Sequence, residues 1–176
     1  MRADAQENHD RVLEVAARAF ERDGTGASLK AIAREAGVGI GTVYRRFPTR
    51  EALVEAVYRQ EVDHLCAVGA DLARRRPGVP ALRDWMETFV DFMATKRGLG
   101  DSLRAVLTSE DDRQQTRDRL RETIAALLEG PGIRTGLEPN DLLMALGGIT
   151  LIAAEERQRE LASRLVELLL AGVRAR

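Results

Sequence analysis

The stretch from Leu29 to Arg50 has the pattern of two short helices joined by a tight turn. Ser28 is suited to cap the first helix, because its hydroxyl can accept a hydrogen bond from an otherwise unpaired backbone N–H. Gly37 stands where that helix must end and the chain reverse, and glycine adopts a positive φ without steric cost. Pro48 disfavours the helical conformation at Phe47 and so ends the second helix. This spacing predicts a helix-turn-helix.

The same stretch is locally basic, although the net charge of the whole chain is only −1. A uniformly basic coat for nucleic acid is therefore excluded, whereas a single DNA-facing surface fits. In a helix-turn-helix the second helix enters the major groove of DNA, where such a charge is useful. Between residues 28 and 50 the basic side chains are Lys30, Arg34, Arg45, Arg46 and Arg50, and the only acidic one is Glu35.

Composition and periodicity predict an all-α protein. Hydrophobic residues make up 44% of the chain and aromatic residues only 4%, and the abundant alanine, leucine, arginine and glutamate favour helix. Apolar residues recur at helical spacing, and glycine or proline clusters such as Gly98-Leu99-Gly100 separate the segments. We expect about nine helices, over residues 7–22, 29–36, 40–46, 49–75, 80–96, 101–107, 109–128, 139–155 and 158–175.

Cysteine content and hydropathy bear on the cellular compartment. The single cysteine, Cys66, excludes an internal disulfide and favours a reducing environment. No charged segment followed by an apolar run opens the sequence, so we expect no secretory signal. No apolar run reaches the ~18 residues that span a bilayer. The expectation is a cytoplasmic, soluble protein without a membrane partner.

Two segments carry a family resemblance. The F-x-x-x-G pattern of Phe20–Gly24 and the run LKAIAREAGVGIGTVYRRFPTREAL from Leu29 to Leu53 resemble the N-terminal domain of the TetR family of transcriptional regulators. The run Ala94–Leu99, after an aromatic helix, is similar to the SbtR-like subgroup. The resemblance implies a three-helix DNA-binding domain over residues 1–50 and a larger helical ligand-binding and dimerisation bundle over residues 51–176. It also implies a homodimer that binds a pseudo-palindromic operator and usually represses.

The family motif assigns DNA-binding roles to particular residues. Thr42 and Tyr44 would bind phosphates, and Arg50 would grip the DNA backbone from the start of the next helix. Hydroxyls and cations on phosphates fix the register of the protein, while groove-facing side chains read the bases. Since Gly39 and Gly41 offer little side chain, we expect apolar contact from Ile40 and a share of shape readout. The full set of expected DNA-binding residues is Lys30, Ile40, Gly41, Thr42, Tyr44, Arg45 and Arg50.

The aromatic helix predicted over residues 80–96 suggests a pocket for a small apolar effector. For each residue taken alone, ordinary core packing is the better interpretation, and the family resemblance favours the pocket. Lys96 and Arg97 either face an anionic ligand or cap the helix, and capping is the preferred interpretation. The expected pocket residues are Trp85, Phe89, Phe92, Met93, Leu103, Leu107, Leu120, Ile124 and Met144.

The last two predicted helices suggest how two copies would associate. A helix-turn-helix protein generally binds two half-sites as a dimer, and members of this family dimerise through their last two helices. Gly147 would permit close approach of helices, or would only weaken its own helix by ~1 kcal/mol relative to alanine. The expected interface residues are Leu142, Leu146, Gly147, Ile149, Leu161, Leu165, Leu168 and Leu169.

Enzyme signatures are missing from the sequence. There is no G-x-S-x-G and no phosphate-binding loop, and Gly39-Ile40-Gly41 lacks the strand context of a dinucleotide site. His64 and Cys66 are two residues apart and do not share a helix face, so a metal site is not expected. We expect no catalytic residues, no metal and no cofactor. The alternative interpretation is a helical small-molecule binding or interaction protein without sequence-specific DNA binding, which the intact Lys30, Thr42, Tyr44 and Arg50 disfavour.

Overall fold

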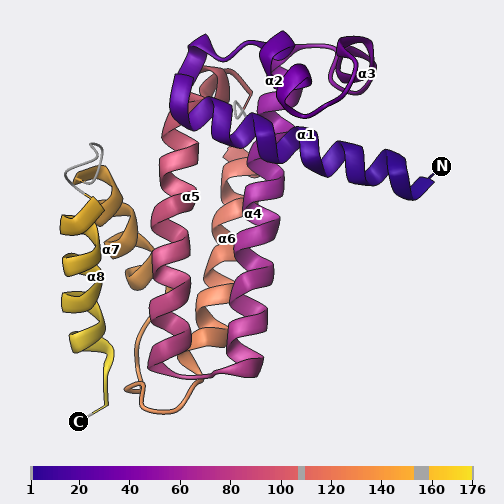
Figure 1. Cartoon of the computed structure of the whole chain (residues 1–176). Coiled ribbons are helices and arrows are strands. Elements are labelled where there is room, and N and C mark those ends of the chain that lie inside the picture. The colour runs from indigo at the N-terminus through magenta and orange to yellow at the C-terminus, as the bar shows by residue number, and fades with distance from the viewer. Residues whose placement is uncertain (1, 107–109, 153–158, 176) are drawn as a thin grey trace. The chain divides into compact units, whose positions relative to one another are not determined.

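The computed structural model describes residues 2–106, 110–152 and 159–175, and these are folded as helices and connecting turns. No strand occurs in these ranges, and the nearest approach to one is an isolated bridge between Ile133 and Arg174. The expected all-α class is confirmed (Figure 1). The helices are α1 Arg2–Asp23, η1 Gly24–Gly26 (a 3-10 turn), α2 Leu29–Glu35, α3 Ile40–Arg46, α4 Arg50–Arg75, α5 Val79–Val106, α6 Glu110–Leu128, α7 Pro139–Ile152 and α8 Arg159–Val173.

The described chain has eight α-helices where about nine were expected. The difference lies in α5, which continues through Gly98-Leu99-Gly100 instead of ending before it. Leu99 and Leu103, one helical turn apart, are both buried. Burying a leucine contributes roughly 1.5–3 kcal/mol, and each glycine costs a helix only about 1 kcal/mol relative to alanine. The burial of Leu99 between the glycines and of Leu103 after them therefore outweighs the weak helix propensity of the glycines.

The chain forms two compact units. We call Met1–Glu61 with Thr95–Glu110 the head unit, and Val62–Ala94 with Asp111–Arg176 the body unit. Helices α4 and α5 each contribute one part to the head unit and one to the body unit. The expected boundary between a DNA-binding domain (1–50) and a regulatory domain (51–176) divides the chain by function, and this division stays a prediction.

The core of the head unit is built by α1, α2, α3 and the first turns of α4. Phe20 on α1, Ile32 on α2 and Leu53 on α4 are almost completely buried. From α3 and the residue that follows it, Val43 and Phe47 are buried as well. Buried apolar side chains from all four helices therefore hold the helix-turn-helix together.

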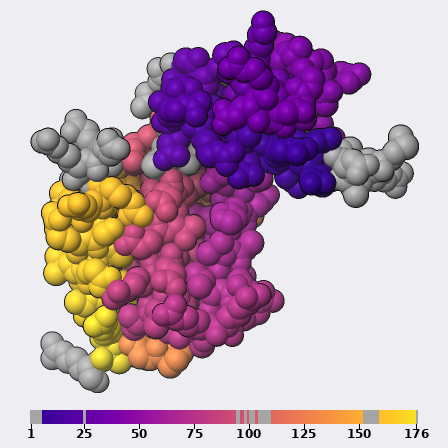
Figure 2. Space-filling view, in the orientation of Figure 1, coloured from indigo at the N-terminus to yellow at the C-terminus, as the bar shows by residue number. Residues whose placement is uncertain are grey.

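The body unit is organised around Trp85. The indole Nε1–H of Trp85 on α5 donates a 3.0 Å hydrogen bond to the carbonyl oxygen of Leu65 on α4. Arg119 on α6 pairs with Asp63 on α4 at 2.6 Å. These contacts join the body-unit parts of α4 and α5 to α6, and the three helices run side by side (Figure 1). Helix α8 lies at the surface of this unit, in yellow in Figure 2.

Candidate nucleic-acid interface

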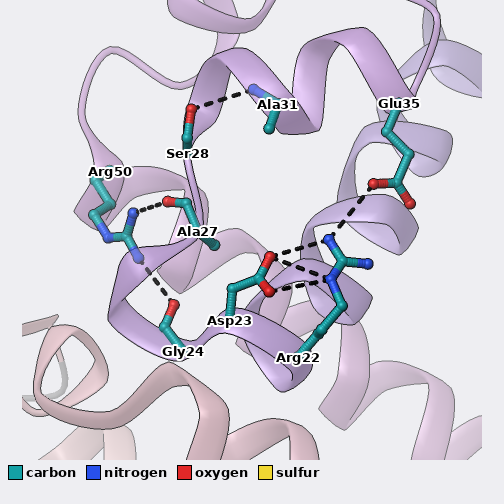
Figure 3. Close-up of polar contacts among 8 residues, drawn as sticks. All are labelled: Arg22, Asp23, Gly24, Ala27, Ser28, Ala31, Glu35 and Arg50. Carbon is teal, nitrogen blue, oxygen red and sulfur yellow. Dashed lines mark hydrogen bonds and ion pairs between the residues drawn. The ribbon is translucent and has the colours of Figure 1, made fainter.

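Local interactions fix the geometry of the helix-turn-helix. The Ser28 hydroxyl accepts a 3.3 Å hydrogen bond from the backbone N–H of Ala31, which caps α2 (Figure 3). Gly37 has φ +68°, the left-handed conformation expected at the reversal. The Thr49 hydroxyl accepts a 3.1 Å bond from Ala52 N–H at the start of α4. The sequence-based predictions for Ser28 and Gly37 are confirmed.

The buried anchors of α3 determine which of its residues face solvent. Val43 and Phe47 hold the helix from one side, and at about 100° per residue the opposite side carries Gly41 and Arg45. Tyr44 is 51% exposed and Ile40 is 39% exposed. Tyr44 is therefore not a core residue, because half of its surface is exposed. Of the expected DNA-binding residues, those exposed to solvent are Lys30, Ile40, Gly41, Thr42, Tyr44 and Arg45.

Polar contacts within the head unit set the charge near α3. The Arg45 guanidinium donates a 3.2 Å hydrogen bond to the Thr42 hydroxyl, so these two side chains lie together on α3. Glu35, the only acid between residues 28 and 50, has Arg22 of α1 at 3.8 Å (Figure 3). Arg22 also pairs with Asp23 at 3.0 Å. The positive charge of Arg22 on α1 therefore partly offsets the negative charge of Glu35.

His9 is a neighbour of α3 that sequence reasoning missed. Its ring stacks on Phe47 with 5.4 Å between centroids and 21° between planes. Its Nδ1 accepts a 3.1 Å hydrogen bond from Arg46 Nε–H, which requires the unprotonated nitrogen of a neutral imidazole. Burial and then the charge of Arg46 lower the pKa of His9, against an opposing effect of Asp10. No local signal could reveal a contact between residues 37 positions apart in the sequence.

Arg50 is the expected DNA-binding residue whose guanidinium is already engaged within the chain. Its Nη1 donates to the carbonyl oxygen of Ala27, and its Nη2 donates to that of Gly24 at 3.3 Å (Figure 3). The guanidinium carbon lies 5.1 Å from the centroid of the Phe20 ring. Arg50 is half-buried, unlike the six exposed residues.

The expected pocket residues are mostly buried, but they do not form one set. Trp85 and Phe89 have ring centroids 5.7 Å apart, and Phe89 and Phe92 have centroids 6.0 Å apart. Met144 is 65% exposed, because it lies on the solvent side of α7, so its place in a pocket is corrected. Leu107 lies outside the described residues. In the body unit the remaining members are Trp85, Phe89, Phe92, Met93, Leu120 and Ile124, whereas Leu103 belongs to the head unit.

The preferred interpretation of Lys96 and Arg97 as helix caps is wrong, because α5 continues to Val106. The ammonium nitrogen of Lys96 lies 5.9 Å from the ring centroid of Tyr58 on α4. Burial lowers the pKa of Arg97, and the charge of Glu21 on α1 acts in the opposite direction. Both basic side chains therefore lie near residues of the head unit.

The expected dimer-interface residues divide into buried and accessible ones. Leu142 and Leu146 are buried within the chain, because they face the interior side of α7, and their place in an interface is corrected. Leu168 is 70% exposed and Leu151 is 77% exposed. Sequence reasoning did not assign Leu151 or Met144 to this surface, although both follow from the helical period once one buried residue of α7 is known. The accessible expected residues are Gly147, Ile149, Leu161, Leu165, Leu168 and Leu169.

Helix α8 is held to α5 by a polar seam, which determines the face that it leaves open. Arg159 pairs with Glu87 at 2.6 Å and with Asp91 at 2.9 Å. Arg83 pairs with Glu167 at 2.7 Å. Beside the seam Ala162, Val166, Leu170 and Val173 are buried. Since a helix turns about 100° per residue, the side away from both contains Leu161, Leu165, Leu168 and Gly172.

The described ranges lack two further kinds of feature. There, no three His, Cys, Asp or Glu side chains are grouped closely enough to hold a metal ion. Among the same residues, no helix has the length and apolar character that crossing a bilayer requires.

The N-terminal and C-terminal parts of the sequence each match a known protein family. Residues 12–57 match the bacterial regulatory proteins of the tetR family. Residues 77–175 match the C-terminal domain of SbtR-like transcriptional regulators. Helix-turn-helix-type transcriptional regulators from Staphylococcus aureus strains USA300 and NCTC 8325 are 39% identical over 64 residues, 36% of this chain and 35% of the length of each relative. The chain thus spans about a third of the length of these curated relatives.

Solved structures extend the similarity over nearly the whole chain. A TetR transcriptional regulator from Streptomyces coelicolor is 43% identical with a TM-score of 0.83, covering 94% of this chain and 97% of that one. A TetR transcription regulatory protein from Mycobacterium vanbaalenii is 31% identical with a TM-score of 0.77, covering 99% of each chain. This chain therefore belongs to the TetR family of transcriptional regulators, with a DNA-binding helix-turn-helix and an SbtR-like C-terminal domain.

Proposed function

We propose that the protein binds a pseudo-palindromic operator as a homodimer and represses transcription until a small apolar effector releases it. It would act in the cytoplasm and without catalytic activity. The observation that carries the proposal is the exposed side of α3, where Ile40, Tyr44 and Arg45 face solvent while Val43 and Phe47 anchor the helix. A rigidly anchored helix with an exposed polar and apolar edge suits insertion into the major groove.

Each exposed residue has a role that its chemistry permits. The hydroxyls of Thr42 and Tyr44 would donate to phosphate oxygens, and the cationic Lys30 would lie at the DNA backbone or a base edge. Ile40 has no polar atom in its side chain, so it would contact a thymine methyl group. Space is open where a Cβ at Gly41 would lie, which lets the DNA approach the backbone closely there. Arg45 would contact a base edge or the groove wall.

The proposed dimer uses the open faces of α7 and α8. Met144 and Leu151 lie two turns apart on α7, with Gly148 between them, and Leu168 lies on the open side of α8. A Cβ added to Gly147 or Gly148 would meet nothing within 4 Å, so a partner helix could pack closely against this segment. Exposed leucine and methionine side chains at helical spacing favour a four-helix contact between two copies.

The proposed effector site lies in the body unit among Trp85, Phe89 and Ile124. Helix α4 begins in the head unit and ends in the body unit, so displacing its body-unit part would be transmitted to its first turns. In a dimer that displacement would change the separation of the two α3 helices. Such regulation requires that the effector bind the two conformations with different affinities.

The proposal is tested with purified full-length protein and a random pool of short DNA duplexes at a stated, near-physiological salt concentration, followed by sequencing of the retained DNA. Enrichment of an inverted repeat is expected for the wild type. Leu168→Asp, which leaves the helix-turn-helix intact, should lose the repeat and retain at most single half-sites. A folded, dimeric wild type that enriches no sequence would contradict operator binding and favour a small-molecule binding protein.

A further inference from the structure

Arg50 occupies a position between three segments of the head unit. It is the first residue of α4, and its guanidinium donates to the carbonyl oxygens of Gly24, the first residue of the 3-10 turn η1, and of Ala27, the residue that follows this turn (Figure 3). The same group lies 5.1 Å from the centre of the Phe20 ring on α1. The Arg50 side chain thus links the start of α4 to the last turn of α1 and to the connection between α1 and α2.

The contacted connection leads directly into α2. Ala27 N–H donates a 3.3 Å bond to the Gly24 carbonyl, which makes the connection a closed turn. Ser28 follows Ala27 and caps α2 through the backbone N–H of Ala31. A shift of the Ala27 carbonyl therefore moves the residue that starts α2. Through the buried Ile32 and Val43, the position of α2 in turn bears on that of α3.

We infer that Arg50 is a positioning residue, which braces the start of α2 against the start of α4, and not a phosphate contact. The inference rests on the proposed DNA binding. A guanidinium suits this place because its planar fork can serve two carbonyls at once while its face lies on an aromatic ring. A lysine ammonium carries the same charge but is a compact point donor, and it cannot reproduce this arrangement.

Two substitutions separate a brace from a phosphate contact. Arg50→Lys keeps the charge, and lysine binds phosphate well, so a phosphate contact would survive it. A bracing role would not survive Arg50→Lys, because the lysine cannot hydrogen-bond to both carbonyl oxygens in the same way. Arg50→Gln removes the charge, and loss of one phosphate contact lowers the slope of log affinity against log salt by about 0.9. A brace leaves that slope unchanged.

The experiment measures operator affinity over a series of sodium chloride concentrations, and backbone amide hydrogen exchange of the free full-length protein. The variants are Arg50→Lys and Arg50→Gln, with Arg59→Lys as the matched control. Arg59 is on the same helix, its side chain is 67% exposed, and it pairs with its helix neighbour Glu55. The operator is the repeat enriched by the wild type.

We expect both Arg50 variants to lose operator affinity by roughly tenfold at every salt concentration, with the wild-type slope, as loss of charged hydrogen bonds would produce. Their amides at residues 27–32 should exchange faster, while amides of the body unit and of Arg59→Lys exchange as in the wild type. Wild-type affinity and exchange in Arg50→Lys would overturn the inference, as would a reduced salt slope with unchanged exchange in Arg50→Gln. If the wild type binds no DNA, the proposed function fails, and the exchange of residues 27–32 alone decides whether Arg50 is a brace.

Discussion

Replacing Gly69 by alanine tests how closely α4, α5 and α6 pack around Trp85. A Cβ at residue 69 would lie 2.2 Å from Cγ2 of Thr123 on α6 and 2.9 Å from Nε1 of Trp85 on α5. Neither neighbour can move freely. The Thr123 hydroxyl donates a 2.9 Å bond to the Arg119 carbonyl, and the indole N–H donates to the Leu65 carbonyl at 3.0 Å. Thr123 is also β-branched, which restricts its χ1 angle.

Two opposing effects set the size of the change. Overpacking a core costs ~1–3 kcal/mol, and a contact of 2.2 Å with a restrained side chain belongs at the upper end. Alanine in place of glycine stabilises a helix by about 1 kcal/mol. The net expectation is a loss of about 2 kcal/mol of unfolding free energy. For a chain of this size that lowers Tm by about 4–8 °C at fixed protein concentration.

The assay is thermal and urea-induced unfolding followed by tryptophan fluorescence. Trp85 is the only tryptophan of the chain, so its emission reports directly on the altered site. Thr123→Ser removes the nearest carbon and keeps the hydroxyl, so Gly69→Ala should cost less in that background than in the wild type. Gly69→Ala with wild-type or greater stability, and with unchanged emission, would refute the close packing of these helices.

Three further predictions concern DNA, the dimer and pH. Tyr44→Phe should weaken binding to every duplex by about 0.5–1.5 kcal/mol, the value of one neutral hydrogen bond; unchanged affinity in a fluorescence anisotropy titration would mean that the hydroxyl does not contact DNA. Leu168→Asp should sediment as a folded monomer, whereas Glu160→Gln, on the polar side of α8, should remain dimeric; a dimeric Leu168→Asp would place the interface elsewhere. Since the pKa of His9 is lowered from 6.5 in the folded protein, the unfolded chain binds more protons there, and stability falls as the pH drops below 6.5. When the pH is lowered from about 8 to about 5, the Tm of His9→Gln should fall less than that of the wild type. Equal falls in Tm would show that His9 does not cause the loss of stability.

Local chemistry was sufficient to predict the helix-turn-helix. The capping role of Ser28, the positive φ of Gly37 and the stop at Phe47 each depend on residues within a few positions of one another. Such interactions are encoded in short sequence windows, so their prediction does not require a tertiary structure. The all-α class follows in the same way from composition and period.

The continuity of α5 is a different kind of result. Gly98 and Gly100 weaken a helix wherever they occur, and sequence reasoning placed a break there. The opposing contribution comes from Leu99 and Leu103, whose burial depends on the packing of α5 within the head unit. Tertiary burial overrides local propensity at such positions, and its extent cannot be calculated from the window alone.

Contacts between distant segments account for the unexpected polar neighbours. His9 reaches Arg46 across 37 residues, and Arg50 reaches Ala27 across 23. The family pattern identifies Arg50 as a cation near the DNA-binding helices, but it does not say which oxygen atoms the cation contacts. That choice depends on where the α1–α2 connection places its carbonyls, which is a property of the folded head unit.

The assignment of leucines on α7 and α8 shows why composition alone cannot separate a core from a partner surface. Leu146 and Leu168 are chemically the same, yet one is fully buried and the other is 70% exposed. The difference is the rotation of each helix about its own axis, at about 100° per residue. On α8 the pairs Arg83–Glu167 and Arg159–Glu87 fix that rotation. Breaking both pairs would leave only the buried side of α8 to keep Leu168 outward, so the proposed dimer should weaken even though neither arginine lies on its face.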